Sequence, residues 1–158
     1  MPKRTSAGIL TFKIKDRGPE VFLVHPGGPF WAKKDAGAWS IPKGEYGQDE
    51  DPLAAAKREF REETGLEVEG ELLALSPVKQ PGGKVVTAWA CRMDIVIGQC
   101  ASNTFSLEWP PKSGLVREFP EVDRFGWFTL EEARSKILRA QTGFLDELEA
   151  RLENRKTD

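Results

Sequence analysis

The segment of residues 51–65 constrains the fold more than any other, because both ends of a helix are encoded in it. Asp51 is a good N-cap residue, and Pro52 suits the first helical position. Residues 53–63 are mostly good helix formers, and Gly65 follows where a left-handed C-terminal cap is favourable. The sequence therefore predicts a helix that begins after Asp51 and ends before Gly65.

One face of this helix is anionic. Glu59, Glu62 and Glu63 are spaced i, i+3 and i+4, so their carboxylates share a face in the last turns, where the helix dipole disfavours each by about 0.3–1 kcal/mol. A solvated acidic surface neutralised by Arg58 and Arg61 is one interpretation. A divalent-cation site is the other, because clustered hard oxygens suit Mg²⁺ or Mn²⁺.

Strand and helix patterns alternate along the rest of the chain. Strand-like runs cover residues 7–15, 20–25, 38–41, 69–76, 85–97, 105–109 and 124–128, and helical patterns cover 130–139 and 143–154. A turn signal between the first two runs predicts a hairpin. The irregular alternation favours an α/β fold in which helices cover both faces of a mixed sheet. With 158 residues and 39% hydrophobic residues, we expect one domain over residues 1–158.

Charge and apolar patterning exclude several classes of protein. The 23 basic and 25 acidic residues give a net charge of −2, which argues against a nucleic-acid partner. No segment approaches the roughly 20 apolar residues of a membrane span, and no signal peptide is evident, so we expect a cytoplasmic protein without a membrane partner. Cys91 and Cys100 lack the spacing of a zinc site or disulfide framework and are expected to be reduced and structural.

The segment from Gly44 to Leu66 resembles the signature of the Nudix hydrolase superfamily at every specified position. The matching residues are Gly44, Glu50, Arg58, Glu59, Phe60, Arg61, Glu62, Glu63, Thr64, Gly65 and Leu66. Residues 39–43 resemble the strand that leads into this signature, and residues 121–133 resemble the closing strand and helix of the family. The resemblance implies a Nudix-type α/β/α sandwich with a mixed β-sheet. It also implies hydrolysis of a diphosphate linkage in a nucleoside diphosphate attached to a further group, with Mg²⁺ as cofactor and Mn²⁺ as a possible substitute.

The resemblance also implies roles for particular residues. Glu59 and Glu63 are the expected principal metal ligands, and Glu62 is a further ligand or the group that orients the attacking water. The backbone carbonyl of Lys43 is expected to complete the coordination, and its side chain is a candidate phosphate contact. Arg58 is expected to orient the site.

Local physical arguments also apply to Arg58 and Gly44. As the neighbour of Glu59 on the helix, Arg58 points about 100° away from it and could pair with loop acids such as Glu50. Gly44 is expected to adopt a backbone conformation that other residues resist.

Candidates outside the signature are weaker. Glu121 is the first candidate for a catalytic base or additional metal ligand and Glu118 is the second, although either could be a surface carboxylate. Trp31 and Trp109 lie in proline-containing loops and are candidates for base stacking. His25, the single histidine, either contacts phosphate or base or has a structural role.

The expected partner is a nucleotide substrate, with the chain a monomer or homodimer. A loose resemblance around residues 119–122 and 127–128 suggests a dinucleoside polyphosphate such as diadenosine tetraphosphate. The first alternative is a (deoxy)nucleoside triphosphate pyrophosphohydrolase, including one for oxidised nucleotides. A non-catalytic nucleotide-sensing module and an isomerase on the same fold are further alternatives.

Overall fold

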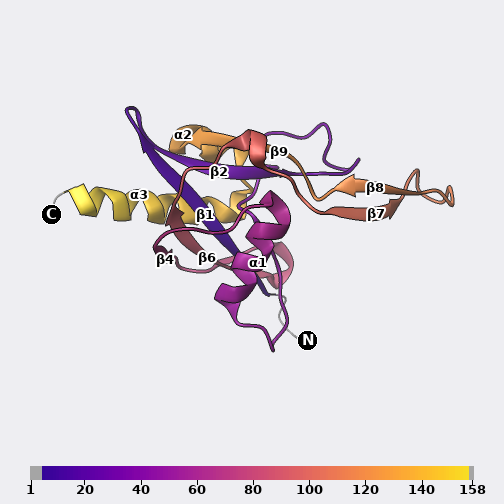
Figure 1. Ribbon diagram of the computed structural model, residues 1–158, viewed down its shortest axis with the longest axis horizontal. Coiled ribbons are helices and arrows are strands. Elements are labelled where there is room, and N and C mark those ends of the chain that lie inside the picture. The colour runs from indigo at the N-terminus through magenta and orange to yellow at the C-terminus, as the bar shows by residue number, and fades with distance from the viewer. Residues whose placement is uncertain (1–4, 157–158) are drawn as a thin grey trace.

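A mixed β-sheet forms the middle layer of the protein (Figure 1). The computed structural model describes residues 5–156. The strands are β1 (Thr5–Lys15), β2 (Gly18–Pro26), β3 (Lys43–Glu45), β4 (Leu72–Ala74), β5 (Val78–Lys79), β6 (Val85–Arg92), β7 (Thr104–Glu108), β8 (Val116–Pro120) and β9 (Val122–Thr129). The sheet order is β4-β6-β1-β2-β9, with β3 paired to β1 and β5 to β6. Only the β1–β6 pair is parallel among the pairs of this sheet in the described part of the chain.

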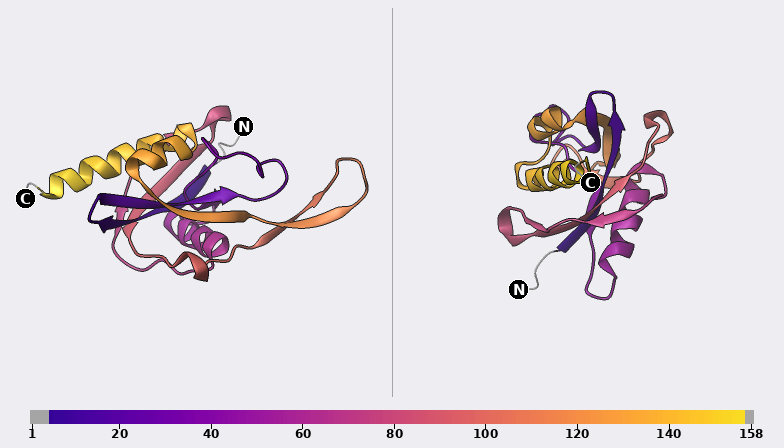
Figure 2. Two further views of the ribbon diagram at one scale, coloured as in Figure 1. Left: turned by 90° about the horizontal axis from the view of Figure 1, so that it is seen from above. Right: turned by 90° about the vertical axis from the view of Figure 1, so that its left-hand side faces the viewer.

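Helices cover both faces of the sheet, as predicted. They are α1 (Pro52–Thr64), α2 (Leu130–Lys136) and α3 (Thr142–Lys156). Figure 2 shows α2 and α3 on one face and α1 on the other. The α/β/α sandwich is therefore confirmed. No helix in the described residues is long and apolar enough to cross a membrane.

Alternation along β1 builds a hydrophobic core on each face. Leu10 and Phe12 pack in the cluster that contains Leu148 of α3, whereas Ile9 packs in the cluster that contains Phe60 of α1. Because successive side chains of a strand point to opposite faces, one strand contributes to both cores. Each such side chain stabilises the fold by about 1.5–3 kcal/mol when fully buried.

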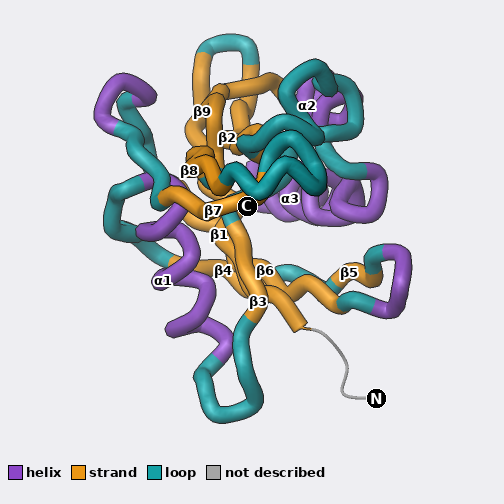
Figure 3. The backbone as a smooth tube through the Cα atoms, turned by 90° about the vertical axis from the view of Figure 1, so that its right-hand side faces the viewer, coloured by secondary structure: helices purple, strands orange, loops and turns teal. Residues whose placement is uncertain are grey.

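The β7–β8 hairpin projects beyond the main sheet (Figures 1 and 2), and it points toward the viewer in Figure 3. Its first strand agrees with the predicted run 105–109, but β8 was not predicted. Residues 116–118 of β8 are exposed, so the strand carries no apolar alternation that a sequence pattern could detect. Phe105 and Phe119 pair across the hairpin, with ring centroids 6.0 Å apart, at the end that joins the body.

Two predicted strands are wrong in part. Residues 38–41 form only isolated bridges, because the amide of Ile41 donates to Oε1 of the Gln141 side chain, 3.1 Å away, in place of a strand partner. The run 85–97 ends as a strand at Arg92, and the Asp94 carboxylate then accepts from the amide of Ile95 at 2.9 Å. Side-chain bonds to the backbone end both segments.

Three other element boundaries differ from the prediction. The expected strand 69–76 is reduced to β4, and the short β5 follows it. The expected helix 130–139 ends at Lys136, where Ile137 adopts an extended backbone and α2 stops. The last helix extends slightly beyond the predicted range 143–154 at both ends.

Candidate active site

The caps predicted for α1 are present and fix the direction of its acidic face. The Asp51 carboxylate accepts from the amide of Ala54 at 3.0 Å. Gly65 adopts the left-handed conformation, with φ of 78°, and its amide donates to the carbonyl of Arg61. Ala56 and Phe60 are fully buried against the sheet, so the carboxylates of the helix are held by a fixed element.

Glu59 lies directly against β3. A Cβ atom placed on Gly44 would lie 2.0 Å from Cδ of Glu59, so only glycine leaves room for this carboxylate. Gly44 does not have a positive φ, and its requirement is therefore close approach rather than the unusual conformation expected from the sequence. Burial, followed by repulsion from Glu62, raises the pKa of Glu59.

Arg58 is the cation that holds the acidic residues in this conformation. Its Nε and Nη2 atoms donate to the two carboxylate oxygens of Glu50 at 2.8 and 2.9 Å, which confirms the predicted pair. Its Nη1 atom also donates to Glu59 at 2.8 Å and reaches Glu62 at 3.3 Å. Arg58 therefore turns back toward Glu59 rather than away from it, whereas Arg61 pairs with Glu67 outside the cluster.

Glu63 lies in a cavity of about 220 Å³ together with Lys43, Trp31 and Glu121. Burial raises the pKa of Glu63 to about 8, and the repulsion from Glu59 and Glu121 adds to this shift. The positive charge of the Lys43 side chain opposes this rise in the pKa of Glu63. Burial lowers the pKa of the Lys43 side chain. Two of the expected metal-site residues and two candidates from outside the signature thus share one cavity.

Glu121 reaches the cavity from the junction of β8 and β9. Its backbone is held on both sides: the amide donates to the carbonyl of Asn103 at 2.8 Å, and its carbonyl accepts from the amide of Gly27 at 2.9 Å. Burial raises the pKa of its carboxyl, and Glu62 raises it further. Glu118, the second candidate, lies opposite Ser106 on the exposed hairpin and does not line this cavity.

The donors of this cluster fit a hard divalent cation. Burial raises the pKa values of Glu59, Glu63 and Glu121, and repulsion from other carboxylates of the cluster adds to each shift, so a bound cation would favour their ionised forms. In the described residues, however, no three acidic, histidine or cysteine side chains are already arranged around one point as metal ligands. Arg58 occupies oxygens of Glu59 and Glu62 in this conformation, so cation binding would require these contacts to rearrange.

The three candidate residues for base recognition lie in different environments. Trp31 lines the cavity beside Glu63. Trp109 is half-buried, and its ring meets that of Phe30 edge to face, with centroids 5.3 Å apart.

His25 is fully buried. Its ring nitrogens lie 2.6 Å from Asp123 Oδ1 and 2.6 Å from the carbonyl oxygen of Lys34. The structure therefore favours a structural role for His25 over contact with phosphate or base. The two partners lie 98 and 9 residues from His25 in sequence, and no motif pointed to them.

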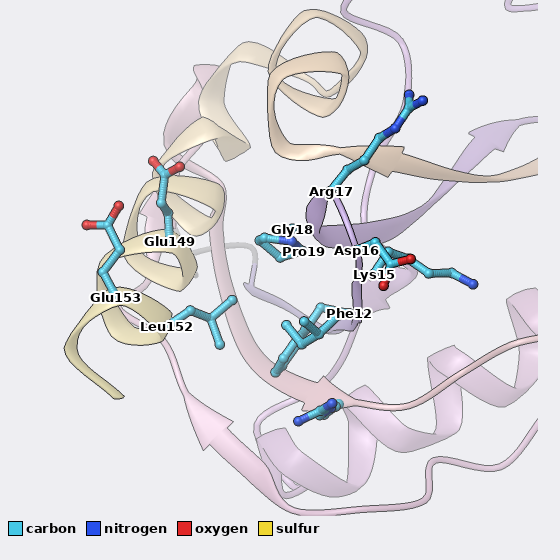
Figure 4. Close-up of a pocket in the computed structure, with 11 residues that line it drawn as sticks. Phe12, Lys15, Asp16, Arg17, Gly18, Pro19, Glu149, Leu152 and Glu153 are labelled. Carbon is cyan, nitrogen blue, oxygen red and sulfur yellow. The ribbon is translucent and has the colours of Figure 1, made fainter. Parts of the chain in front are cut away.

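A larger cavity of about 630 Å³ lies at the other end of the sheet (Figure 4). It is formed by the β1–β2 turn and the C-terminal half of α3, and Phe12 and Leu152 lie in its wall. β3 pairs with the beginning of β1, whereas this cavity borders its end, so the length of β1 separates it from Gly44. None of the candidate site residues lines it.

The sequence matches the family model described as NUDIX domain over residues 2–148. The chain therefore belongs to the Nudix family. A comparison with curated proteins gave no significant match.

Solved structures share the fold at low sequence identity. One is an Ap4A hydrolase of C. elegans in a binary complex, at 21% identity and a TM-score of 0.64, with 96% of this chain and 98% of that chain covered. The NUDIX domain of NrtR from Shewanella oneidensis, complexed with ADP ribose, has 16% identity and a TM-score of 0.67, with 96% and 90% covered. A mutT/nudix family protein from Listeria innocua has 16% identity and a TM-score of 0.66, with 99% and 98% covered.

Proposed function

We propose that this protein is a metal-dependent pyrophosphohydrolase that cleaves a diphosphate linkage in a nucleotide substrate. The observation that carries the proposal is that Glu63 of α1 and Glu121 line one cavity. The neighbouring α1 carboxylates repel them, Glu59 acting on Glu63 and Glu62 on Glu121. Burial, with repulsion between carboxylates, raises the pKa values of Glu59, Glu63 and Glu121, and a bound cation would stabilise their ionised forms. The membership of the Nudix family supports the same reaction.

Each group of the site has a role in this reaction. Glu59, Glu62 and Glu63 would hold Mg²⁺, with the carbonyl of Lys43 as a further donor, and the cation would neutralise the charge of the diphosphate in the transition state. Arg58 orients Glu59 and Glu62 through its bonds to them.

The proton of the attacking water requires a base. Glu121 is the candidate, because a carboxylate with a raised pKa accepts a proton more readily near neutral pH. Glu62 is the alternative base. The partly buried Lys43 ammonium contributes positive charge to the cavity, where it would contact a phosphate oxygen.

We further propose a dinucleoside polyphosphate, such as diadenosine tetraphosphate, as the substrate. Trp31 lines the cavity, and the adjacent Phe30 contacts Trp109 of the hairpin, so aromatic rings from two segments lie on one side of the site. Two bases can stack on two such positions, whereas a nucleoside triphosphate needs only one. The fold of the C. elegans Ap4A hydrolase is consistent with this choice.

The test measures product formation from a panel of nucleotides with Mg²⁺ and with a chelator. The panel contains diadenosine tetraphosphate, ADP-ribose, ATP, dGTP and oxidised dGTP, and chromatography identifies the products. We expect Mg²⁺-dependent cleavage, fastest for diadenosine tetraphosphate. Cleavage of triphosphates alone would favour the alternative of a (deoxy)nucleoside triphosphate pyrophosphohydrolase. Nucleotide binding without any product would favour a sensing module and contradict the proposed hydrolysis.

A further inference from the structure

His25 lies at the end of β2 beneath the segment of residues 27–38, which we call the recognition loop because it contains Trp31. The side chain is fully buried, and the proposed chemistry does not use it. It is also the only histidine in the chain. A buried titratable group outside the reaction therefore requires another explanation.

Both ring nitrogens of His25 face hydrogen-bond acceptors. Nδ1 lies 2.6 Å from Oδ1 of Asp123, and Nε2 lies 2.6 Å from the carbonyl oxygen of Lys34. A carboxylate and a carbonyl cannot donate a proton, so each bond requires that the ring nitrogen carries one. The contacts are those of an imidazolium cation paired with Asp123.

Two charged groups lie around this ring. Asp123 is the anion in contact with it, and the same Oδ1 atom lies 3.9 Å from Nε of Arg124. The Arg124 guanidinium also donates to the Lys34 carbonyl at 3.3 Å, so both acceptors of His25 are shared with Arg124. The ring of Trp39 packs edge to face on the imidazole, with centroids 5.3 Å apart. Nε1 of Trp39 donates to Asp35, which also pairs with Lys136 of α2.

The bond from Nε2 holds the recognition loop at a defined point. Residues 32–37 are exposed, and the loop makes local turns in which the amide of Lys34 donates to the carbonyl of Trp31 at 3.0 Å. Lys34 is thus one turn from Trp31, and its carbonyl binds a side chain that is itself fully buried. Movement of this carbonyl would displace Trp31 from the wall of the cavity.

We propose that His25 is a positioning residue for nucleotide recognition: as a buried imidazolium, it binds Asp123 and holds the Lys34 carbonyl, which keeps Trp31 beside Glu63 and Glu121. This inference rests on the proposed function, because Trp31 is assigned there to base stacking. It does not place His25 in contact with the substrate. The expected consequence of losing the bond is weaker recognition with little change in the chemical step.

The first test is the ¹⁵N NMR spectrum of the imidazole in the unmodified protein at neutral pH. With one histidine in the chain, both ring nitrogens are assigned without ambiguity. We expect two protonated nitrogens whose protons exchange slowly with water, because the ring is fully buried. One protonated and one unprotonated nitrogen would overturn the proposal, whether or not the protein hydrolyses any nucleotide.

The second test follows Trp31 with 5-fluorotryptophan labelling and ¹⁹F NMR, with assignment from Trp31→Phe. His25→Phe keeps a ring but removes both donors, and we expect the Trp31 resonance to shift or broaden while that of Trp89, in β6, is unchanged. Asp94→Asn is the matched control, because it alters an exposed ion pair with Lys13. An unchanged Trp31 resonance in folded His25→Phe would overturn the proposal.

The third test compares KM and kcat for diadenosine tetraphosphate. In His25→Phe we expect KM to rise at least about 5-fold, the lower limit for loss of one stacked base, with kcat within about 3-fold of the parent. His25→Gln restores one amide donor and is expected to have an intermediate KM. A parental KM in folded His25→Phe would overturn the proposal. If His25→Phe does not fold, the ¹⁵N spectrum of the unmodified protein is the test that supports or overturns the proposal.

Discussion

The acidic helix α1 and the recognition loop both contribute to the cavity of the site, through Glu63 and Trp31, but they are built differently. The β7–β8 hairpin contacts the recognition loop through Trp109 and Phe30. α1 is capped at both ends and buries Phe60 completely in the core. The loop and the hairpin are exposed: Phe30 is 60% and Val116 is 70% exposed, and the hairpin lies off the main sheet. The comparison indicates that the charged groups proposed to bind the metal lie on a packed element, whereas the aromatic groups proposed to select the substrate lie on exposed segments, where loops tolerate variation.

Glu121 lies where these segments meet. It follows the last strand of the hairpin, and its carbonyl accepts from the amide of Gly27 at the start of the recognition loop. Its side chain nevertheless lines the cavity that contains Glu63. Glu121 therefore connects the recognition loop and the hairpin to the acidic helix α1. Substitutions in α1 should mainly affect the chemical step, and substitutions in the loop or the hairpin should mainly affect substrate binding.

Glu63→Gln is expected to have the largest effect on activity. The substitution keeps the shape of the side chain but removes a charge from the proposed metal site. We expect activity with Mg²⁺ to fall by at least about three orders of magnitude, because a bound cation contributes several kcal/mol to the transition state and about 1.4 kcal/mol is a factor of ten. Steady-state kinetics at saturating Mg²⁺ measures this loss, and circular dichroism tests folding.

Glu67→Gln is the matched control for this change. Glu67 is exposed beyond the end of α1 and pairs with Arg61 at 3.5 Å. The Glu67→Gln variant should retain the parental rate of hydrolysis. Activity of Glu63→Gln within a few-fold of the parent would mean that the acidic face of α1 is a solvated surface rather than a metal site.

Glu121→Gln tests the junction between these segments. If Glu121 is the base, the rate should fall by about 100-fold or more, because proton transfer by a positioned side chain contributes about 10²–10⁴. Glu118→Gln changes the neighbouring hairpin carboxylate, which faces Ser106 outside the cavity, and should leave the rate unchanged. Equal effects of the two substitutions, or no effect of Glu121→Gln, would shift the role of base to Glu62.

The same contrast explains what the sequence predicts and what it does not. The start and end of α1 depend on Asp51, Pro52 and Gly65, which act within their own helix, so local pattern is sufficient to locate them. Strand β8 has no local pattern, because its residues are exposed and its partner is β7 alone in the described residues. Its position is determined by pairing rather than by burial.

Long-range contacts limit the prediction of the site as well. The spacing of Glu59, Glu62 and Glu63 predicts a common face, but their proximity to Glu121 arises only when β9 joins the sheet. The reason for Gly44 is likewise a contact with Glu59, 15 positions away, and not its own backbone conformation. The partners of His25 come from β9 and the recognition loop, and neither could be inferred from a lone histidine.

Trp109→Ala is expected to change substrate affinity rather than the chemical step. Stacking on one base contributes roughly 1–3 kcal/mol, so KM for diadenosine tetraphosphate should rise about 5-fold to 150-fold, with kcat less affected. The structure adds Phe30 as a partner of this ring, and Phe30→Ala should therefore cause a smaller rise in KM. Unfolding of Trp109→Ala would identify Trp109 as a core residue. An unchanged KM in the folded variant would remove Trp109 from the proposed stacking positions and leave Trp31 as the remaining one.

The smallest expected effect concerns how the recognition loop is joined to α2. Hydrogen bonds from Lys136 and then from Trp39 lower the pKa of the exposed Asp35 carboxyl. A carboxyl whose pKa is lower in the folded state stabilises the fold above its unfolded pKa of about 3.9, and this contribution is lost as the pH falls through the folded value. Asp35→Asn removes the titrating group and keeps an acceptor for Trp39. The parent should therefore be slightly more stable than the variant at pH 7, and the difference should narrow below about pH 4.

Thermal unfolding of both proteins at pH 7 and at about pH 3 measures this difference. Asp16→Asn, in the β1–β2 turn at the far end of the sheet, controls for the general effect of removing a surface carboxylate. A difference that persists unchanged at acid pH would show that the Asp35 contacts do not depend on its charge. A loss of stability as large as that caused by truncating a core residue such as Phe60 would contradict the comparison itself, because the recognition loop would then be as strongly integrated into the fold as α1.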